Sequence, residues 1–126
     1  SQIKVELALA DDCPMALADS DQMSQVFINL VMNAVHAMPD GGMLRIGLAL
    51  EKQMVKLTIA DTGHGIPRDV VEKVFEPFFT TKEFGQGTGL GLTVVKGIIE
   101  EHQGSITVDS EEGRGTRFTI VLPKSI

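Results

Sequence analysis

Hydrophobic and polar residues alternate with a period of two over several short stretches of this 126-residue chain. Such alternation is typical of strands that bury one face against a core and expose the other. Turn residues separate the stretches, and residues 51–53 join two of them as a hairpin. The pattern predicts strands at 3–9, 15–18, 43–50, 54–60, 105–110 and 116–123.

Apolar residues recur at a helical period in a second set of segments. This period predicts a helix over 22–38, whose start is favoured by the polar residues at 19–21. A short helix is expected at 67–75 and a third at about 88–103, with Gly104 as its C-terminal cap. The order of strands and helices predicts an α/β two-layer sandwich, in which helices cover one face of a mixed sheet.

Composition narrows the range of partners and compartments. The length fits a single domain over 1–126, and the formal net charge of −6 argues against nucleic acid or an anionic membrane surface as the main partner. The single cysteine, Cys13, excludes an internal disulfide and suits a reducing, cytoplasmic compartment. No apolar run reaches the roughly 18 residues of a transmembrane helix, so no direct membrane contact is expected of this domain, whether or not a parent protein is membrane-anchored.

A polar stripe follows one side of the long predicted helix. Asn29, Asn33 and His36 stand at positions i, i+4 and i+7, which share a helix face. Asparagine is unfavourable in the middle of a helix because its side chain competes with the backbone for hydrogen bonds. The two carboxamide oxygens can ligate a hard cation such as Mg²⁺ and lie near phosphate oxygens. The alternative is a polar edge that faces solvent.

The sequence DTGHGIP follows a predicted strand. Its first residue, Asp61, therefore stands at a strand's carboxyl end, where ligands often bind in α/β sheets. The carboxylate can accept a hydrogen bond from an exocyclic amino group such as adenine N6, and Ile66 can pack against the base. Gly63 and Gly65 permit positive φ or a close backbone approach. The alternative is a simple turn cap, and His64 is expected to be an exposed loop residue.

The sequence GQGTGLG places glycine at alternate positions directly before a predicted helix. It matches neither GxGxxG nor the P-loop pattern. Backbone N–H groups of residues 87–91 are left uncovered by side chains, and the helix N-terminus adds a positive dipole end, a combination that binds phosphate. Lys82 is the nearest cation. The long irregular segment 75–87 before it holds four of the six Phe residues, so it is expected to be functional or mobile, although a plain flexible loop is the alternative.

In chain order, these segments resemble the motif boxes of the ATP-binding catalytic domain of two-component sensor histidine kinases, a family with the Bergerat fold. The matches are the N box (about 21–38, with NLVMNA at 29–34), the G1 box (61–67), the F box and ATP lid (75–88, beginning FEPFFTTK), the G2 box (GTGLGL, 87–92) and the G3 box (GRGTRF, 113–118). FEPFFTTK is most similar to nitrogen-regulation and oxygen-sensing kinases. The resemblance covers about residues 19–123 and implies a mixed, mostly antiparallel sheet of about five strands with about three helices on one face.

The resemblance implies a site for ATP and Mg²⁺. It makes Asn33 the principal Mg²⁺ ligand with Asn29 beside it, and it groups these two with Lys82 as the catalytic residues. His36 stands where many relatives have a basic phosphate contact, and Asp61 would bind adenine N6. The other implied nucleotide contacts are Gly63, Gly65, Ile66, Gly87, Thr88, Gly89, Leu90, Gly91 and Thr116, of which Thr116, like Phe118, is expected mainly to support the sheet beneath the pocket.

The reaction implied by the resemblance is transfer of the γ-phosphoryl group of Mg·ATP to a histidine on a separate dimerisation domain, which in turn serves a response regulator. None of His36, His64 and His102 fits the H-E-[LIF]-x-x-P pattern of that domain, so the phosphoacceptor domain is expected to be absent. The resemblance also implies that the isolated domain is a monomer, since the dimer contacts of such kinases lie elsewhere. The Phe cluster would anchor the lid and offer an apolar face to the partner domain.

Two other functions on the same fold stay open: a serine kinase of the anti-sigma type and a nucleotide-sensing module without catalysis. The serine kinases tend to carry an acidic residue at the position of Asn29 and lack FEPFFTTK. The chaperone, gyrase and mismatch-repair ATPases would need a Glu there to activate water. A carboxamide is not a general base, so slow intrinsic hydrolysis is expected.

Overall fold

A computed structural model of the chain describes residues 2–9, 20–76 and 91–123. Within these residues, a five-stranded sheet is accompanied by helices on one side. The elements in chain order are β1 (Ile3–Leu9), α1 (Ser20–His36), β2 (Gly42–Glu51), β3 (Met54–Asp61), α2 (Arg68–Val71), α3 (Gly91–Glu101), β4 (Ser105–Glu111) and β5 (Gly115–Pro123).

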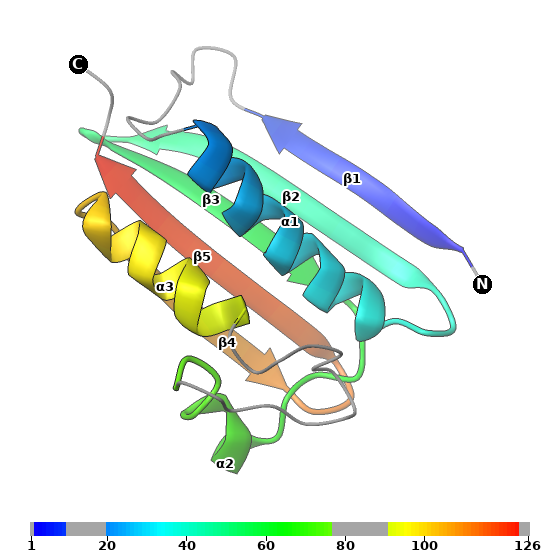
Figure 1. Ribbon diagram of the computed structural model, residues 1–126. Coiled ribbons are helices and arrows are strands. Elements are labelled where there is room, and N and C mark those ends of the chain that lie inside the picture. Colours follow the sequence, from blue (N-terminus) through cyan, green and yellow to red (C-terminus); the bar gives the residue numbers. More distant parts are fainter. Residues whose placement is uncertain (1, 10–19, 77–90, 124–126) are drawn as a thin grey trace.

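The sheet has the strand order β1-β2-β3-β5-β4. The edge strand β1 runs parallel to β2, and the remaining neighbours pair antiparallel. Helices α1 and α3 lie side by side over one face, while α2 lies at the end of the sheet where β3 and β4 finish and β5 begins (Figure 1). The predicted two-layer sandwich with a mixed, mostly antiparallel sheet is confirmed.

The core lies between the helices and the inward face of the sheet. Helix α1 contributes Val26 and Leu30, and α3 contributes Val95 and Ile99, all completely buried. They pack in one cluster with inward-facing strand residues such as Ile120, because every second residue of each strand points to the helices. Each fully buried aliphatic side chain contributes about 1.5–3 kcal/mol by leaving water, so this interface holds the two layers together.

The ends of the predicted helices differ from those observed. Helix α1 begins and ends two residues earlier than predicted, and α2 covers only Arg68–Val71 of the nine predicted residues, with Pro67 as its N-cap. The chain after α2 continues in turns that bury Val74 and direct Phe75 inward to an edge-to-face contact with Phe118, with ring centroids 6.3 Å apart. Tertiary packing therefore ends this helix early. The predicted strand 15–18 and the start of the third helix at 88–90 lie outside the described residues.

The cap of α3 is a correction to the prediction. The residue with left-handed backbone is Gln103, at φ 64°, and its N–H donates to the carbonyl of Glu100. The N–H of Gly104 donates to the carbonyl of Ile99, which completes a Schellman motif one residue earlier than expected. Glycine is required at 104 for a different reason, since a Cβ there would collide with the carbonyl oxygen of Val121.

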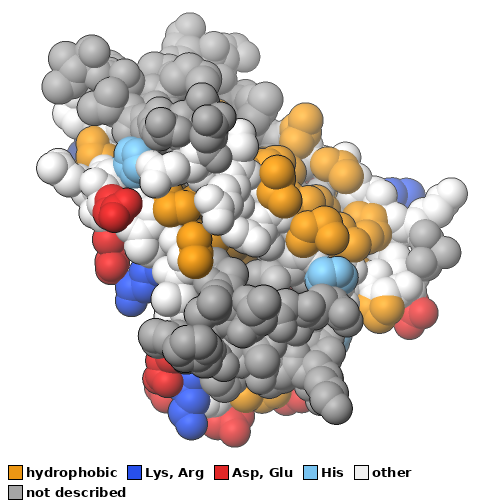
Figure 2. All heavy atoms as spheres, viewed as in Figure 1, with side chains coloured by type: hydrophobic (Ala, Val, Ile, Leu, Met, Phe, Trp, Pro, Cys, Tyr) orange, Lys and Arg blue, Asp and Glu red, His pale blue; other side chains and the backbone are white. Residues whose placement is uncertain are grey.

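The helical layer leaves the edge of the sheet uncovered. Val5 and Leu7 of β1 are 59% and 61% exposed although they share a face with the buried Leu44 and Ile46 of β2. Together with Phe27, Ile28 and Met32 of α1 they belong to the exposed large hydrophobic residues, and apolar side chains gather over α1 and β1 in the space-filling view (Figure 2). None of the described helices has the length and hydropathy needed to cross a bilayer.

The exposed glycine in the middle of α3 yields a stability prediction. A Cβ added at Gly97 meets no atom within 4 Å, so Gly97→Ala should remove backbone entropy from the unfolded chain without a steric cost. We expect the free energy of unfolding to rise by about 0.5–1 kcal/mol in urea denaturation, with an unchanged m-value. The matched control, Gly104→Ala, should be destabilising because of the collision with Val121; equal effects of the two substitutions would contradict this account.

Candidate functional site

A concave site lies at the end of the sheet where β3 finishes and β5 begins. It is formed where the C-terminal part of α1, the loop after β3, the start of α3 and the start of β5 meet. Its lining residues are Asn33, Ala37, Asp61, His64, Gly65, Ile66, Leu92, Thr116 and Phe118. Segments far apart in the chain thus contribute to one cavity.

The structure brings together only part of the residue set expected from the sequence. Asn33, Asp61, Gly65, Ile66 and Thr116 share the cavity, whereas the described side chains of Asn29 and His36 on the same helix as Asn33 do not line it. The proposed contacts that lie outside the described residues are Lys82, Gly87, Thr88, Gly89 and Leu90.

The cavity also contains residues that sequence reasoning missed or misjudged. Leu92 lines it, and because Leu92 is the second residue of α3, the amino-terminal end of this helix lies at the cavity. His64 was expected to be an exposed loop residue, but it is half-buried and lines the cavity. Its backbone explains this position, because the N–H of His64 donates to the carbonyl of Ala37 at 3.1 Å and fastens the loop to the end of α1.

Asp61 is the acidic group of the site. It is the last residue of β3, directly opposite Thr116 of β5. Burial raises the pKa of the Asp61 carboxyl, while hydrogen bonds from the backbone N–H groups of Gly63 and Thr116, and the nearby charge of His64, act in the opposite direction. The Gly63 bond to Oδ1 is 2.8 Å long. A desolvated carboxylate with lone pairs left over is suited to accept from a ligand's N–H group.

The glycines after Asp61 allow the loop to fit between two walls. A Cβ on Gly63 would collide with the carbonyl of Ala37 at the end of α1, and one on Gly65 would collide with the carbonyl of Glu111 at the end of β4. Gly65 also has φ +72°, which other residues rarely adopt. Close packing of the backbone, rather than flexibility, thus accounts for both positions.

The β4–β5 hairpin holds the other side of this loop. The N–H of Gly113 donates to the carbonyl of His64 at 2.7 Å, and the N–H of Ile66 donates to Oγ of Ser110 at 2.7 Å. Sequence reasoning missed Ser110. The signal that could have found it is the strand pattern, because a polar residue stands where Ile106 and Val108 predict an inward-facing apolar one.

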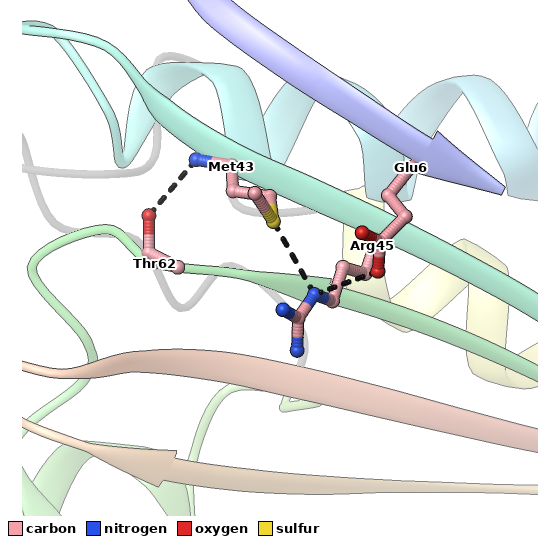
Figure 3. A network of polar contacts seen from close by, with 4 residues as sticks. All are labelled: Glu6, Met43, Arg45 and Thr62. Atoms are coloured by element: carbon pink, nitrogen blue, oxygen red, sulfur yellow. Dashed lines mark hydrogen bonds and ion pairs between the residues drawn. The ribbon is translucent and has the colours of Figure 1, made fainter.

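Thr62 attaches the start of the loop to β2 (Figure 3). Its Oγ1 accepts from the N–H of Met43 at 3.0 Å and donates weakly to the sulfur of Met38 at 3.8 Å. The sulfur of Met43 accepts a hydrogen bond from Nε of Arg45. The same Nε forms an ion pair with Glu6 of β1 at 3.1 Å. That ion pair is largely exposed and contributes little to stability, so Thr62 is the member of this network that positions the site.

Phe75, the first residue of the FEPFFTTK segment, is anchored beside the cavity. The ring of Phe75 contacts Phe118, which lines the cavity, and Nζ of Lys96 lies 5.5 Å from the centre of the Phe75 ring. Oγ1 of Thr93 donates to the carbonyl of Phe75 at 2.9 Å. The beginning of this segment is therefore fixed to α3 and to the floor of the cavity.

Comparisons with known proteins agree with this arrangement. The family described as histidine kinase-, DNA gyrase B-, and HSP90-like ATPase matches residues 18–126. Sporulation kinase E of Bacillus subtilis (strain 168) is 48% identical over 124 residues, which are 98% of this chain and 16% of that protein. Sensor histidine kinase ZraS of Escherichia coli (strain K12) is 40% identical over 125 residues, 99% of this chain and 26% of that protein.

A solved structure leads to the same result. The catalytic domain of histidine kinase ThkA superimposes with a TM-score of 0.85 at 36% identity, covering 97% of this chain and 79% of that one. The chain spans only a small part of the curated relatives that it matches. Motif order, fold and sequence identity agree, and the chain belongs to the family of histidine kinase-, DNA gyrase B- and HSP90-like ATPases.

Proposed function

We propose that this chain is the catalytic ATP-binding domain of a two-component sensor histidine kinase, a single unit over residues 1–126. It donates the γ-phosphoryl group of Mg·ATP to a histidine on a separate dimerisation domain. The observation that carries the proposal is the single cavity that joins Asn33, Asp61 and Thr116, one residue from each of three motif boxes. Two curated relatives that match nearly the whole chain are named kinases, which supports the same reaction.

Asp61 recognises adenine in this proposal. Its carboxylate is desolvated and faces the cavity, where it accepts a hydrogen bond from N6 of the base. Ile66, 7% exposed and part of the same lining, packs against the ring. Gly63 and Gly65 act indirectly, because they let the loop backbone lie close enough to its two walls to shape the base pocket.

The phosphates would lie toward α1 and the start of α3. Among the described side chains, no group of three or more His, Cys, Asp or Glu could hold a metal ion. The carboxamide of Asn33, with Asn29 one turn away, fits Mg²⁺, which usually keeps phosphates and water as most of its ligands. When bound, Mg²⁺ would neutralise charge on the phosphates.

Further phosphate contacts are proposed from the positive end of α3 and from basic side chains. Leu92 is the second residue of α3 and lines the cavity, so the amino-terminal end of this helix lies there. The backbone N–H groups of Thr88, Gly89, Leu90 and Gly91 would donate to phosphate oxygens. Lys82 adds positive charge in this proposal, and His36 is a further phosphate contact. Gly87 lets the backbone approach the phosphates closely.

Phosphoryl transfer needs little covalent chemistry from this chain. An imidazole with a free lone pair is already nucleophilic, so the domain's task is to position ATP and stabilise charge as the bond to the leaving oxygen breaks. Activation of water would need a basic residue near Asn33, and the helix position one turn earlier holds Asn29, a carboxamide. The arrangement therefore favours transfer over hydrolysis.

The proposed setting follows from this chemistry. The direct partner is the dimerisation domain of a parent kinase, whose phosphohistidine serves a response regulator. ATP and a response regulator place the domain in the cytoplasm, whether or not the parent is anchored in a membrane. The isolated domain is proposed to be a monomer.

A phosphorylation assay tests the reaction. The purified domain alone should release negligible phosphate from ATP, whereas mixing with a dimerisation domain and radiolabelled ATP should label the partner with acid-labile, base-stable phosphate. Asn33→Ala should abolish labelling, and Ser24→Ala, exposed on the same helix, should preserve it. Acid-stable label would point to a serine kinase, no label to a nucleotide sensor, and robust hydrolysis by the domain alone would refute the predicted role of Asn29.

Nucleotide selectivity tests the role of Asp61. Guanine presents an oxygen where adenine presents an amino group, so two acceptors would face one another in a buried site. We expect calorimetry to show clear preference for ATP over GTP, and Asp61→Asn to weaken ATP binding about tenfold or more, the usual effect of losing a hydrogen bond to a charged group. Equal affinities for the two nucleotides would reject the assignment.

Asp61→Asn, which should weaken ATP binding, should raise the stability of the nucleotide-free domain. Because burial raises the pKa of Asp61, the folded state holds its proton longer than the unfolded state, whose pKa is near 3.8. The contribution of Asp61 to the stability of the nucleotide-free domain should therefore fall as pH rises above 3.8 and level off once the folded carboxyl has ionised. Asparagine does not ionise, so the free energy of unfolding of Asp61→Asn, measured with denaturant, should increasingly exceed that of the wild type over that pH range. A pH-independent difference would contradict the raised pKa.

A further inference from the structure

We propose that Ser110 is a specificity-determining residue, which fixes the direction of the Thr116 hydroxyl proton so that Thr116, like the neighbouring Asp61, presents only hydrogen-bond acceptors to the cavity. The inference rests on the proposed function, because it concerns the base of a bound nucleotide. It assigns a role to a residue on β4 that lies behind the cavity lining and outside every motif box.

Three contacts meet at the hydroxyl oxygen of Ser110. Oγ accepts from the N–H of Ile66 at 2.7 Å and donates to the carbonyl oxygen of Gly115 at 3.0 Å. It also lies 2.8 Å from Oγ1 of Thr116, where either hydroxyl can be the donor on geometry alone. All three partners are therefore within hydrogen-bond distance of one atom.

The number of protons decides the direction of the third contact. A serine hydroxyl has one proton and two lone pairs. The carbonyl of Gly115 cannot donate, so the Ser110 proton is used there, and the N–H of Ile66 occupies one lone pair. The remaining lone pair can only accept, and all three contacts are satisfied only if Thr116 donates to Ser110. The hydroxyl proton of Thr116 then points toward β4, away from the cavity.

Thr116 is placed where this direction matters. It is 7% exposed, it lines the cavity, and it pairs with Asp61 across β3 and β5. With its proton committed to Ser110, Oγ1 of Thr116 has only lone pairs left for a ligand. Asp61 also has only lone pairs when ionised, so two neighbouring groups present the same polarity.

Two neighbouring acceptors favour one class of group at the 6-position of a purine. At the 6-position of the base, the exocyclic amino group of a 6-aminopurine supplies N–H donors to these acceptors, whereas the carbonyl oxygen of a 6-oxopurine is itself an acceptor and forms no hydrogen bond with them there. A Thr116 hydroxyl without the Ser110 contact can rotate and donate to that carbonyl oxygen. Ser110 therefore suppresses binding of 6-oxopurines, in addition to holding the loop at Ile66.

The test compares ATP with inosine triphosphate, which differs at the 6-position and lacks the 2-amino group of guanine. Calorimetric affinities are measured for the wild type, Ser110→Ala, Thr116→Val and the double variant, with Ser105→Ala, exposed on the same strand, as control. Ser110→Ala should lower the ATP-to-inosine triphosphate affinity ratio by about tenfold, as expected for one regained hydrogen bond. The change should disappear in the Thr116→Val background, because no hydroxyl remains to rotate.

An equal loss of affinity for both nucleotides in Ser110→Ala would overturn the inference, since a purely structural role would leave the ratio unchanged. The same holds if the ratio falls equally in the Thr116→Val background. If Ser110→Ala does not fold, Ser110→Cys, whose thiol is a weak donor and acceptor, should show a smaller shift of the ratio in the same direction. Failure of the wild type to bind ATP would instead refute the proposed function, and it is seen before any ratio is compared.

Discussion

The site depends on one steric constraint, which is that the backbone after β3 must pass between two walls with no space for side chains. One wall is the carbonyl of Ala37 at the end of α1, and the other is the carbonyl of Glu111 at the end of β4. Gly63 and Gly65 meet these walls, and hydrogen bonds from His64 to Ala37 and from Gly113 to His64 hold the loop in place. A helix end and a hairpin are thereby fixed relative to one loop, and Asn33, Asp61 and Thr116 come to share a cavity.

This constraint also explains why Asp61 is both useful and costly. A carboxylate at the end of a strand would normally be solvated, but the loop buries it, and burial raises its pKa. The N–H groups of Gly63 and Thr116 compensate only in part. A group that lowers the stability of the empty fold while facing a cavity is better explained by ligand binding than by architecture.

The sequence was sufficient for the fold and for residues whose signal is local. Alternation predicted the five described strands, and the unusual placement of Asn33 within a helix and Asp61 at a strand end predicted their meeting. It was insufficient where tertiary packing decides. Phe75 packs against Phe118 where α2 was predicted to continue, and Gln103 rather than Gly104 adopts the left-handed cap. Ser110 accepts a hydrogen bond from the N–H of Ile66, which is far away in the sequence. The contact of Ser110 depends on strand register, which the pattern of one strand does not specify.

The cavity is continuous with the hydrophobic core, so binding and stability are not independent in this domain. Phe118 is 5% exposed, belongs to the core cluster, lines the cavity and contacts Phe75. A close-packed interior transmits changes in volume, so a substitution at Phe118 must alter both the floor of the cavity and the packing of the Phe75 ring. Thr116 and Asp61, by contrast, are fixed mainly by hydrogen bonds. The floor of the site is therefore set by packing and its polarity by hydrogen bonding, and variants of the two kinds can be separated because the first changes shape and the second changes which atoms can donate.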